Sequence, residues 1–168
     1  HKHWSPFEMV SMCIKINTTR SIAAQILRHR SFSFQEYSQR YAAVTDNPVI
    51  PAPRRQDLKN RQNSIDDLDE FTVQELQLKT KFVYDQCQTL YDEMLSAGVA
   101  KECARDVLPL STPTTLYMHG NLRSWLTYCD LRCANGTQVE HQTISNQIKE
   151  LIAVYFPKSY AGMWSYET

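Results

Sequence analysis

The sequence is poor in glycine, with four glycines in 168 residues and no glycine-rich run. P-loop and dinucleotide-binding folds hold phosphate on closely spaced glycines, because only glycine lets several backbone amides approach the phosphate together. The shortage of glycine therefore excludes both folds. The sequence also lacks an apolar run of about 18 residues, the minimum that spans a bilayer, and the apolar stretch of a signal peptide. We expect a soluble, intracellular protein that does not bind membranes.

Neither sign of charge is in excess, since 18 lysines and arginines balance 18 aspartates and glutamates. Without net charge the protein has no long-range attraction to nucleic acid or to acidic membrane surfaces, so any anion must bind locally. The five cysteines are odd in number and contain no Cys-x-x-Cys pair, which argues against a disulfide framework and a zinc knuckle. His1 and His3, with Glu8 nearby, lack a well-placed further ligand, so we expect no bound metal.

Hydrophobic residues make up 42% of the chain, enough for the core of one domain over residues 1–168. The order of apolar residues predicts a helix-rich α+β fold. Alternation over residues 10–17 is typical of a strand with one buried face, and residues 114–118 resemble a second, brief strand. Helices are predicted over residues 20–30, 66–97, 100–108, 122–133, 139–155 and from 160 to the end. Residues 46–64, with three prolines, favour a long loop.

For two of the predicted helices, the sequence also predicts which side chains pack against the core and where the helix begins or ends. The helix over residues 20–30 carries an apolar stripe and delivers Arg28-His29-Arg30 at its C-terminal end. The stripe is made of Ile22, Ala23, Ile26 and Leu27. The helix over residues 66–97 begins in an acidic run, which suits the positive end of the helix dipole, and stops at Gly98. Its apolar contacts are expected from the following side chains: Phe71, Leu76, Leu78, Phe82, Val83 and Leu90.

Residues 28–41 combine three arginines, a histidine, a carboxylate and three serines with four aromatic rings. The segment is too polar for a core and too aromatic for an ordinary solvated surface. In an extended conformation Glu36, Ser38 and Arg40 would share one side, where guanidinium and carboxylate groups suit a phosphate and a flat ring. The alternative is a surface cluster of ion pairs, each worth about 0–1 kcal/mol.

A second polar set follows the predicted brief strand. Gln25 and Arg28 lie three apart and share a helix face, so both can face one pocket. Downstream, Asn121 can cap the helix that carries Arg123, Thr127 and Arg132. The free amides of a helix N-terminus attract phosphate, so a nucleotide could dock there. An ordinary capped helix with solvated arginines is the alternative.

Taken together, these motifs resemble the flavin-dependent thymidylate synthases, the ThyX family. That family is marked by Arg-His-Arg, seven residues and then Ser, and Arg28-His29-Arg30 is followed at that spacing by Ser38. Supporting segments lie in the family's order over nearly the whole chain: residues 3–8, 59–64, 104–109, 121–124, 130–132 and 138–140. The resemblance implies an antiparallel or mixed sheet with flanking helices, in a homotetramer. It also implies an N-terminal part that precedes this sequence.

By resemblance, the activity is reductive methylation of dUMP to dTMP with 5,10-methylenetetrahydrofolate as carbon donor and FAD reduced by NADPH. The residues implied for dUMP are Gln25, Ile26, Leu27, Arg28, Glu36, Ser38, Gln39, Arg40, Arg105 and Arg132. Those implied for FAD are Ser5, Arg28, His29, Arg30, Glu36, Asn121, Leu122, Arg123 and Thr127. The sites of such tetramers lie at subunit interfaces, so one chain is not expected to hold a whole site.

The residue types suit this chemistry. C5 of uracil becomes nucleophilic when negative charge develops on the N3–C4 carbonyl side of the ring, and Arg132 is the residue expected to stabilise that charge. Arg40 and Arg105 suit the phosphate. Ser38 has no neighbouring base except Glu36, so we interpret it as a hydrogen-bond donor to the nucleotide rather than a covalent nucleophile.

Two other interpretations stay open from the sequence alone. Residues 28–41, with the arginines of the loop that follows, could bind RNA or single-stranded nucleic acid through stacking on Phe32, Phe34 and Tyr37, although the neutral net charge argues against it. Alternatively, the protein is a structural oligomer whose arginines satisfy interface carboxylates.

Overall fold

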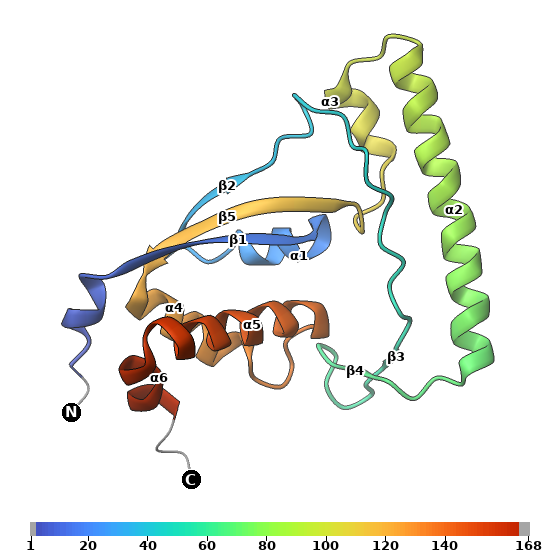
Figure 1. Ribbon diagram of the computed structural model, residues 1–168. Helices are drawn as coiled ribbons and strands as arrows, with labels where there is room; N and C mark the ends of the chain where they lie inside the picture. Colours follow the sequence, from blue (N-terminus) through green and yellow to red (C-terminus); the bar gives the residue numbers. More distant parts are fainter. Residues whose placement is uncertain (1–2, 165–168) are drawn as a thin grey trace.

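A computed structural model describes residues 3–164 and has a three-stranded antiparallel sheet at its centre (Figure 1). The strands are β1 (Ser11–Thr19), β2 (Ser33–Glu36) and β5 (Pro113–Asn121), in the order β1-β5-β2. The predicted α+β class is confirmed. No helix among the described residues is long and apolar enough to cross a membrane.

The strand predicted over residues 114–118 is longer than expected and lies in the middle of the sheet. All nine residues of β5 pair with β1, and its second edge pairs with β2. Leu116 and Met118 are fully buried there. Pairing on both edges extends the strand through Gly120, where an added Cβ would lie 2.5 Å from the ring of Phe32. Glycine is therefore required at this position for Phe32 to seat against the strand.

Four helices pack around the core beneath this sheet: α1 (Arg20–Ile26), α4 (Leu122–Arg132), α5 (Val139–Tyr155) and α6 (Pro157–Trp164). Ile22 and Ile26 of α1 belong to the same hydrophobic cluster as Trp125 and Leu126 of α4, and all four are nearly or fully buried. The bounds predicted for α5 are confirmed. α6 begins at Pro157 instead of residue 160, because proline is favoured in the first turn of a helix, where its missing N–H costs nothing.

The helix predicted over residues 20–30 is shorter than expected. α1 ends at Ile26, and Arg28-His29-Arg30 lie in the turn that follows. The turn is closed by the His29 amide, which donates to the Ile26 carbonyl at 3.0 Å. A longer helix would carry the chain away from β5, whereas Phe32 must pack on Trp125 at 4.7 Å between ring centroids.

A separate arm connects β2 to β5. It contains the hairpin strands β3 (Arg55–Gln56) and β4 (Ser64–Ile65) and the long helix α2 (Glu70–Ser96). Two short turns of helix follow, α3 (Lys101–Ala104) and η2 (Arg105–Val107), where one helix over residues 100–108 was predicted. The predicted loop over residues 46–64 is confirmed except for the two-residue ladder between β3 and β4.

α2 starts four residues later than predicted, because the acidic run is used in another way. Asp67 accepts from Arg55 across the hairpin, and Asp69 is the N-cap, accepting from the Thr72 amide at 2.9 Å. The predicted end is confirmed, since Gly98 adopts a φ of 83° just after the helix. A left-handed glycine at this position is a common helix stop.

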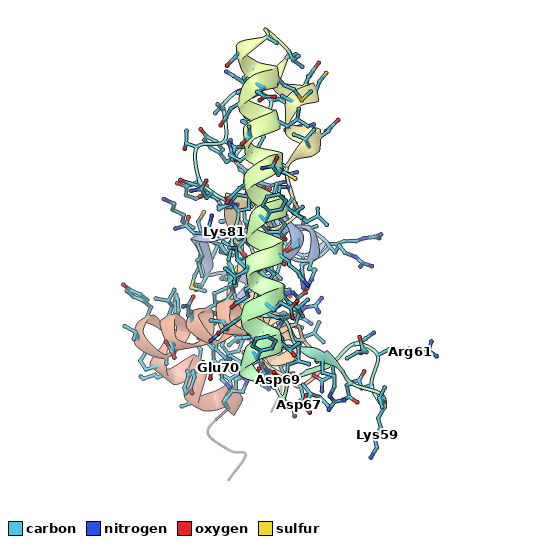
Figure 2. The ribbon with its side chains drawn as sticks, turned by 90° about the vertical axis from the view of Figure 1, so that its right-hand side faces the viewer. Lys59, Arg61, Asp67, Asp69, Glu70 and Lys81 are labelled. Carbon is cyan, nitrogen blue, oxygen red and sulfur yellow. The ribbon has the colours of Figure 1, made fainter. Side chains whose placement is uncertain are left out.

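The prediction that the apolar side chains of α2 pack against the rest of the same chain is wrong. Only Tyr91 is buried among its residues, and the six apolar side chains expected to make its contacts are all exposed. Phe71, Leu78 and Phe82 are 76%, 70% and 66% exposed. Their spacing of seven and four residues places them on one face. Figure 2 looks directly onto α2, with the sheet and its helices behind it.

Candidate functional site

The end of α1 and the end of α4 meet at a cavity of about 640 Å³, called here the Arg132 pocket. Gln25, Arg28, His29 and Arg132 line it together. Its other walls come from the β3–β4 loop and from the segment between α4 and α5, through Gln62, Gly136, Thr137 and Gln138. The prediction that Gln25 and Arg28 face one pocket is confirmed. No carboxylate lines this cavity, so its two guanidinium groups favour an anion or an electron-rich ring.

His29 orients Arg132 in this pocket. Arg132 Nε donates to His29 Nε2 at 3.0 Å. Burial lowers the pKa of His29, and the nearby positive charge of Arg132 lowers it further. His29 is therefore a neutral acceptor. Its bond to Arg132 uses only the Nε hydrogen of the guanidinium. The two terminal nitrogens of the guanidinium stay available to a ligand.

A buried histidine that the sequence analysis missed lies behind the pocket. His141 on α5 is fully buried, and its Nδ1 lies 3.2 Å from Gln25 Oε1 while its Nε2 lies 2.9 Å from the Tyr128 hydroxyl. Its position was open to prediction, because His141 shares the apolar face of α5 with Ile148 and Ile152 at helical spacing. A polar ring on a buried face must find hydrogen-bond partners.

This histidine should make stability depend on pH. Burial, with the charge of Arg132 and the neighbouring His29, lowers the pKa of His141 from 6.5 to about 4. The unfolded chain therefore binds a proton below pH 6.5 that the folded chain refuses, so the free energy of unfolding falls as the pH drops from 6.5 toward 4. The slope from this group is at most about 1.4 kcal/mol per pH unit. His29, shifted the same way, adds to it.

The measurement is the free energy of urea unfolding at pH 7 and pH 5 for wild type and His141→Asn. The variant should lose less stability between the two pH values, because asparagine does not titrate. An equal loss in both proteins would show that His141 is not the titrating group.

A second group of predicted residues gathers beyond the other end of the sheet, around a cavity of about 250 Å³ called here the Arg105 pocket. Arg20, Gln39 and Arg105 line it. Arg105 Nε donates to the Glu102 carbonyl at 3.3 Å, and Arg40 Nε donates to the Glu102 carboxylate at 3.0 Å. Arg40 and Arg105, the two residues expected at the phosphate, thus meet at one residue.

Glu36 is tied to the same region. Its Oε1 accepts from Arg20 at 3.3 Å and from the Thr114 hydroxyl at 2.9 Å. Arg20 was not among the predicted site residues. The available signal was its place as the first residue of a helix that directly follows a strand, since strand-to-helix junctions often carry binding residues.

The extended conformation predicted for residues 36–41 is wrong. The strand stops at Glu36, and residues 39–41 form a turn in which the Tyr41 amide donates to the Ser38 carbonyl at 3.1 Å. Ser38 lines a further cavity of about 820 Å³ with Glu36, while Arg40 reaches Glu102 instead. The last bond of the chain to β5 at this edge runs from the Tyr37 amide to the Thr115 carbonyl, and the turn follows it.

The third group lies at the N-terminal end of α4. Asn121 caps the helix as predicted, accepting from the Ser124 amide at 2.8 Å. Arg123 pairs with Glu8 and lies over the Trp4 ring at 5.9 Å. Thr127 donates to the Arg123 carbonyl at 3.0 Å. Ser5 begins the adjacent short helix η1 (Ser5–Glu8).

The predicted site residues are thus divided among separate parts of one chain. Arg28 and Arg132 share one pocket, Arg40 and Arg105 meet elsewhere, and none of the three cavities described above is lined by all four. The side chains of Ile26 and Leu122 are buried in the core, so any contact they make with a ligand is through the backbone. Arg30 and Leu27 are exposed in the turn after α1. The prediction that Leu27 belongs to the buried stripe of the helix is therefore wrong, because the helix ends before it.

Metal ligands do not gather in the described residues, where no group of three or more histidine, cysteine, aspartate or glutamate side chains is placed to hold an ion. His1, considered above with His3 and Glu8, lies outside the described residues.

The fold is one that a nucleotide methylase uses. The crystal structure of a UMP/dUMP methylase PolB from Streptomyces cacaoi bound with 5-Br UMP matches it with a TM-score of 0.85 and 26% sequence identity. The match covers 95% of this chain and 76% of that chain.

Sequence comparison narrows the class. A probable flavin-dependent thymidylate synthase of Paramecium bursaria Chlorella virus 1 is 51% identical over 157 residues, which are 94% of this chain and 73% of that protein. A flavin-dependent thymidylate synthase of Synechocystis sp. is 50% identical over 161 residues, 96% of this chain and 74% of that protein. The family described as Thymidylate synthase complementing protein matches residues 1–158. The chain belongs to this family, and the identification made from Arg28-His29-Arg30 and Ser38 is confirmed.

Proposed function

We propose that this protein methylates dUMP to dTMP, taking the carbon from 5,10-methylenetetrahydrofolate, with FAD reduced by NADPH. The observation that carries the proposal is the Arg132 pocket, where Gln25, Arg28, His29 and Arg132 line one cavity without a carboxylate. Two of the similar proteins are named flavin-dependent thymidylate synthases, and the similar crystal structure holds a brominated uracil nucleotide.

Arg132 acts on the uracil ring in this proposal. With Nε held by His29, its terminal nitrogens can donate to a ring carbonyl and favour the negative charge that makes C5 nucleophilic. Charge that is already oriented in a site poor in water stabilises a transition state more than the ground state. Arg40, Arg105 and Gln39 then bind the phosphate, and Ser38 donates a hydrogen bond to the nucleotide.

The N-terminal end of α4 fits the flavin cofactor through side chains more than through helix amides. The Leu122 amide donates to the Val10 carbonyl at 2.8 Å and the Ser124 amide to Asn121, so two first-turn donors are already used. Among the residues that the structure describes, the Arg123 guanidinium has an exposed ion pair with Glu8 and a contact with the Trp4 ring. An exposed ion pair is worth about 0–1 kcal/mol, which a cofactor phosphate can replace. Bound FAD supplies the hydride chemistry.

The working enzyme is a homotetramer in this proposal, with each site assembled at a subunit interface. Two features support it. The nucleotide residues fall into two groups around separate pockets, and α2 exposes Phe71, Leu78 and Phe82 on one face. Apolar patches of this kind on a folded chain mark surfaces that another protein covers.

The structure does not favour the nucleic-acid alternative. Of the three rings expected to stack on bases, Phe32 and Phe34 pack against the core, and Phe32 meets Trp125 at 4.7 Å and Tyr128 at 5.9 Å between centroids. Tyr37 is 57% exposed, and one exposed ring does not make the predicted row of stacked bases.

The purified protein should show the absorption bands of an oxidised flavin, which should bleach when NADPH is added under nitrogen. A sample that loses flavin on purification should regain these bands after incubation with FAD. A protein that neither carries nor takes up flavin would contradict the proposed function.

A further inference from the structure

Gln25 is held at both ends of its amide group. Its Nε2 donates to Gln138 Oε1 at 2.7 Å, and its Oε1 lies 3.2 Å from His141 Nδ1. Both glutamines line the Arg132 pocket. His141, by contrast, is fully buried on the far side of Gln25 and is not among the residues that line this cavity.

Tyr128 decides which nitrogen of His141 carries the proton. The Tyr128 side chain is 2% exposed, and among the described residues its hydroxyl meets only His141 Nε2, at 2.9 Å. A buried hydroxyl hydrogen without an acceptor is costly, so the hydroxyl donates and Nε2 is the bare acceptor. In a neutral ring the hydrogen is then on Nδ1.

The hydrogen on Nδ1 in turn sets the orientation of Gln25. An amide oxygen can accept from Nδ1–H, whereas the amide NH₂ group would place donor against donor. The chain of bonds therefore runs from the Tyr128 hydroxyl to His141, from His141 to Gln25, and from Gln25 to Gln138. One amide hydrogen of Gln25 remains for a ligand in the Arg132 pocket.

We propose that His141 is a positioning residue that locks the Gln25 amide with its N–H toward the Arg132 pocket, where it selects a pyrimidine with a carbonyl at the contacted edge. The inference rests on the proposed function, because dUMP is the pyrimidine that it positions. A uracil carbonyl accepts from this N–H, whereas the exocyclic amine of cytosine presents a donor and is rejected. The alternative is that His141 is a buried histidine that stabilises the fold and has no effect on the choice of substrate.

Two substitutions of His141 separate these interpretations. In His141→Asn the amide nitrogen takes the place of Nδ1 and can still donate to Gln25. In His141→Gln the longer side chain reaches the place of Nε2 and can pair with Tyr128, but the donor to Gln25 is lost. Equilibrium binding of dUMP and dCMP is measured for both variants and wild type, together with thermal melting, assembly state, KM and kcat.

We expect His141→Asn to keep the dUMP affinity within about threefold and His141→Gln to lose about tenfold, the value of one well-placed hydrogen bond. The preference for dUMP over dCMP should narrow in His141→Gln, and KM should rise more than kcat falls. Tyr128→Phe removes the hydroxyl that fixes the proton on Nδ1, so it should also lower the dUMP affinity, by less than His141→Gln does. If His141→Gln does not fold, Tyr128→Phe is the variant that tests the inference.

The action through Gln25 is tested by repeating His141→Gln and Tyr128→Phe in a Gln25→Ala background. There the added changes should alter dUMP affinity by less than about twofold, because the group that they orient is gone. Equal losses in both backgrounds, equal effects of asparagine and glutamine at position 141, or an unchanged preference for dUMP would overturn the inference alone. Wild type that binds no dUMP would overturn the proposed function with it.

Discussion

Replacement of Arg132 by alanine is expected to lower the rate of dTMP formation by about 10²–10³-fold, the usual cost of removing one oriented donor from a developing charge. The prediction depends on where Arg132 lies. It is the last residue of α4, it lines the pocket with Gln25 and Arg28, and within the described residues only its Nε donates a hydrogen bond. In the proposed function the terminal nitrogens therefore serve the substrate and not the fold.

The rate is measured as dTMP released from saturating dUMP and methylenetetrahydrofolate with excess NADPH, under nitrogen. Melting temperature, assembly state and flavin content should stay close to wild type, because Arg132 contributes one hydrogen bond to the folded chain. Arg61→Ala is the matched control, since this arginine lies at the tip of the β3–β4 loop and points away from the body of the molecule (Figure 2). It should keep full activity.

Full activity in Arg132→Ala would contradict the role given to this residue and favour the interpretation in which the arginines are purely structural. Loss of folding would also count against it, since the side chain would then be part of the core. The variant His29→Gln keeps a hydrogen-bond acceptor near Arg132. It should therefore lower the rate of dTMP formation less than Arg132→Ala does.

The helices of the core could be predicted from the sequence because their signals are local. Val139–Tyr155 repeats apolar residues at helical spacing, and α4 has both an Asn121 cap and a buried stripe. Such patterns depend on the chain's own geometry, and tertiary contacts did not change them.

Turns near β2 could not be predicted because their cause is distant in sequence. α1 stops at Ile26 so that Phe32 can pack beside Gly120 and Trp125, about ninety residues further on. The extended conformation assigned to residues 36–41 is wrong for a similar reason, since Arg40 binds Glu102, which lies far away in the sequence. Propensity within a short window holds no information on either event.

The candidate site was predictable where the spacing was helical and missed where the partner came from another element. Gln25 and Arg28 follow from their separation of three residues. Arg132 joins them through packing of α4 against α1, which the motif resemblance supplied and the pattern did not. His141 is a residue of this second kind, because its partners Gln25 and Tyr128 come from α1 and α4 while it lies on α5.

The apolar pattern of α2 was correctly recognised and wrongly interpreted. An amphipathic helix shows that one face avoids water, and it does not show whether the same chain or another chain covers that face. In the described structure the chain covers only the side that carries Tyr91. The face with Phe71, Leu78 and Phe82 is exposed, and it is the face that the proposed tetramer would cover.

Replacement of both Leu78 and Phe82 by glutamate is expected to dissociate the proposed tetramer and to reduce dTMP formation by more than about a hundredfold. Charged groups buried without partners at an interface cost several kcal/mol, and each subunit would bring two. The separated chain should stay folded, because both side chains are exposed within it. Light scattering after gel filtration gives the mass, and circular dichroism reports the fold.

Two controls make this outcome specific to α2. The pair Leu78→Met and Phe82→Leu keeps the apolar face and should keep both the tetramer and the activity. Leu58→Glu introduces the same charge at an apolar side chain that is 89% exposed in the β3–β4 loop. This variant should leave the assembly intact.

A tetramer that survives the double glutamate variant would show that α2 does not form the interface. The two separate groups of nucleotide-binding residues would then need another surface to bring them together. A dissociated variant that stays fully active would instead show that one chain holds a complete site, because Arg28, Arg40, Arg105 and Arg132 would be acting without a second subunit.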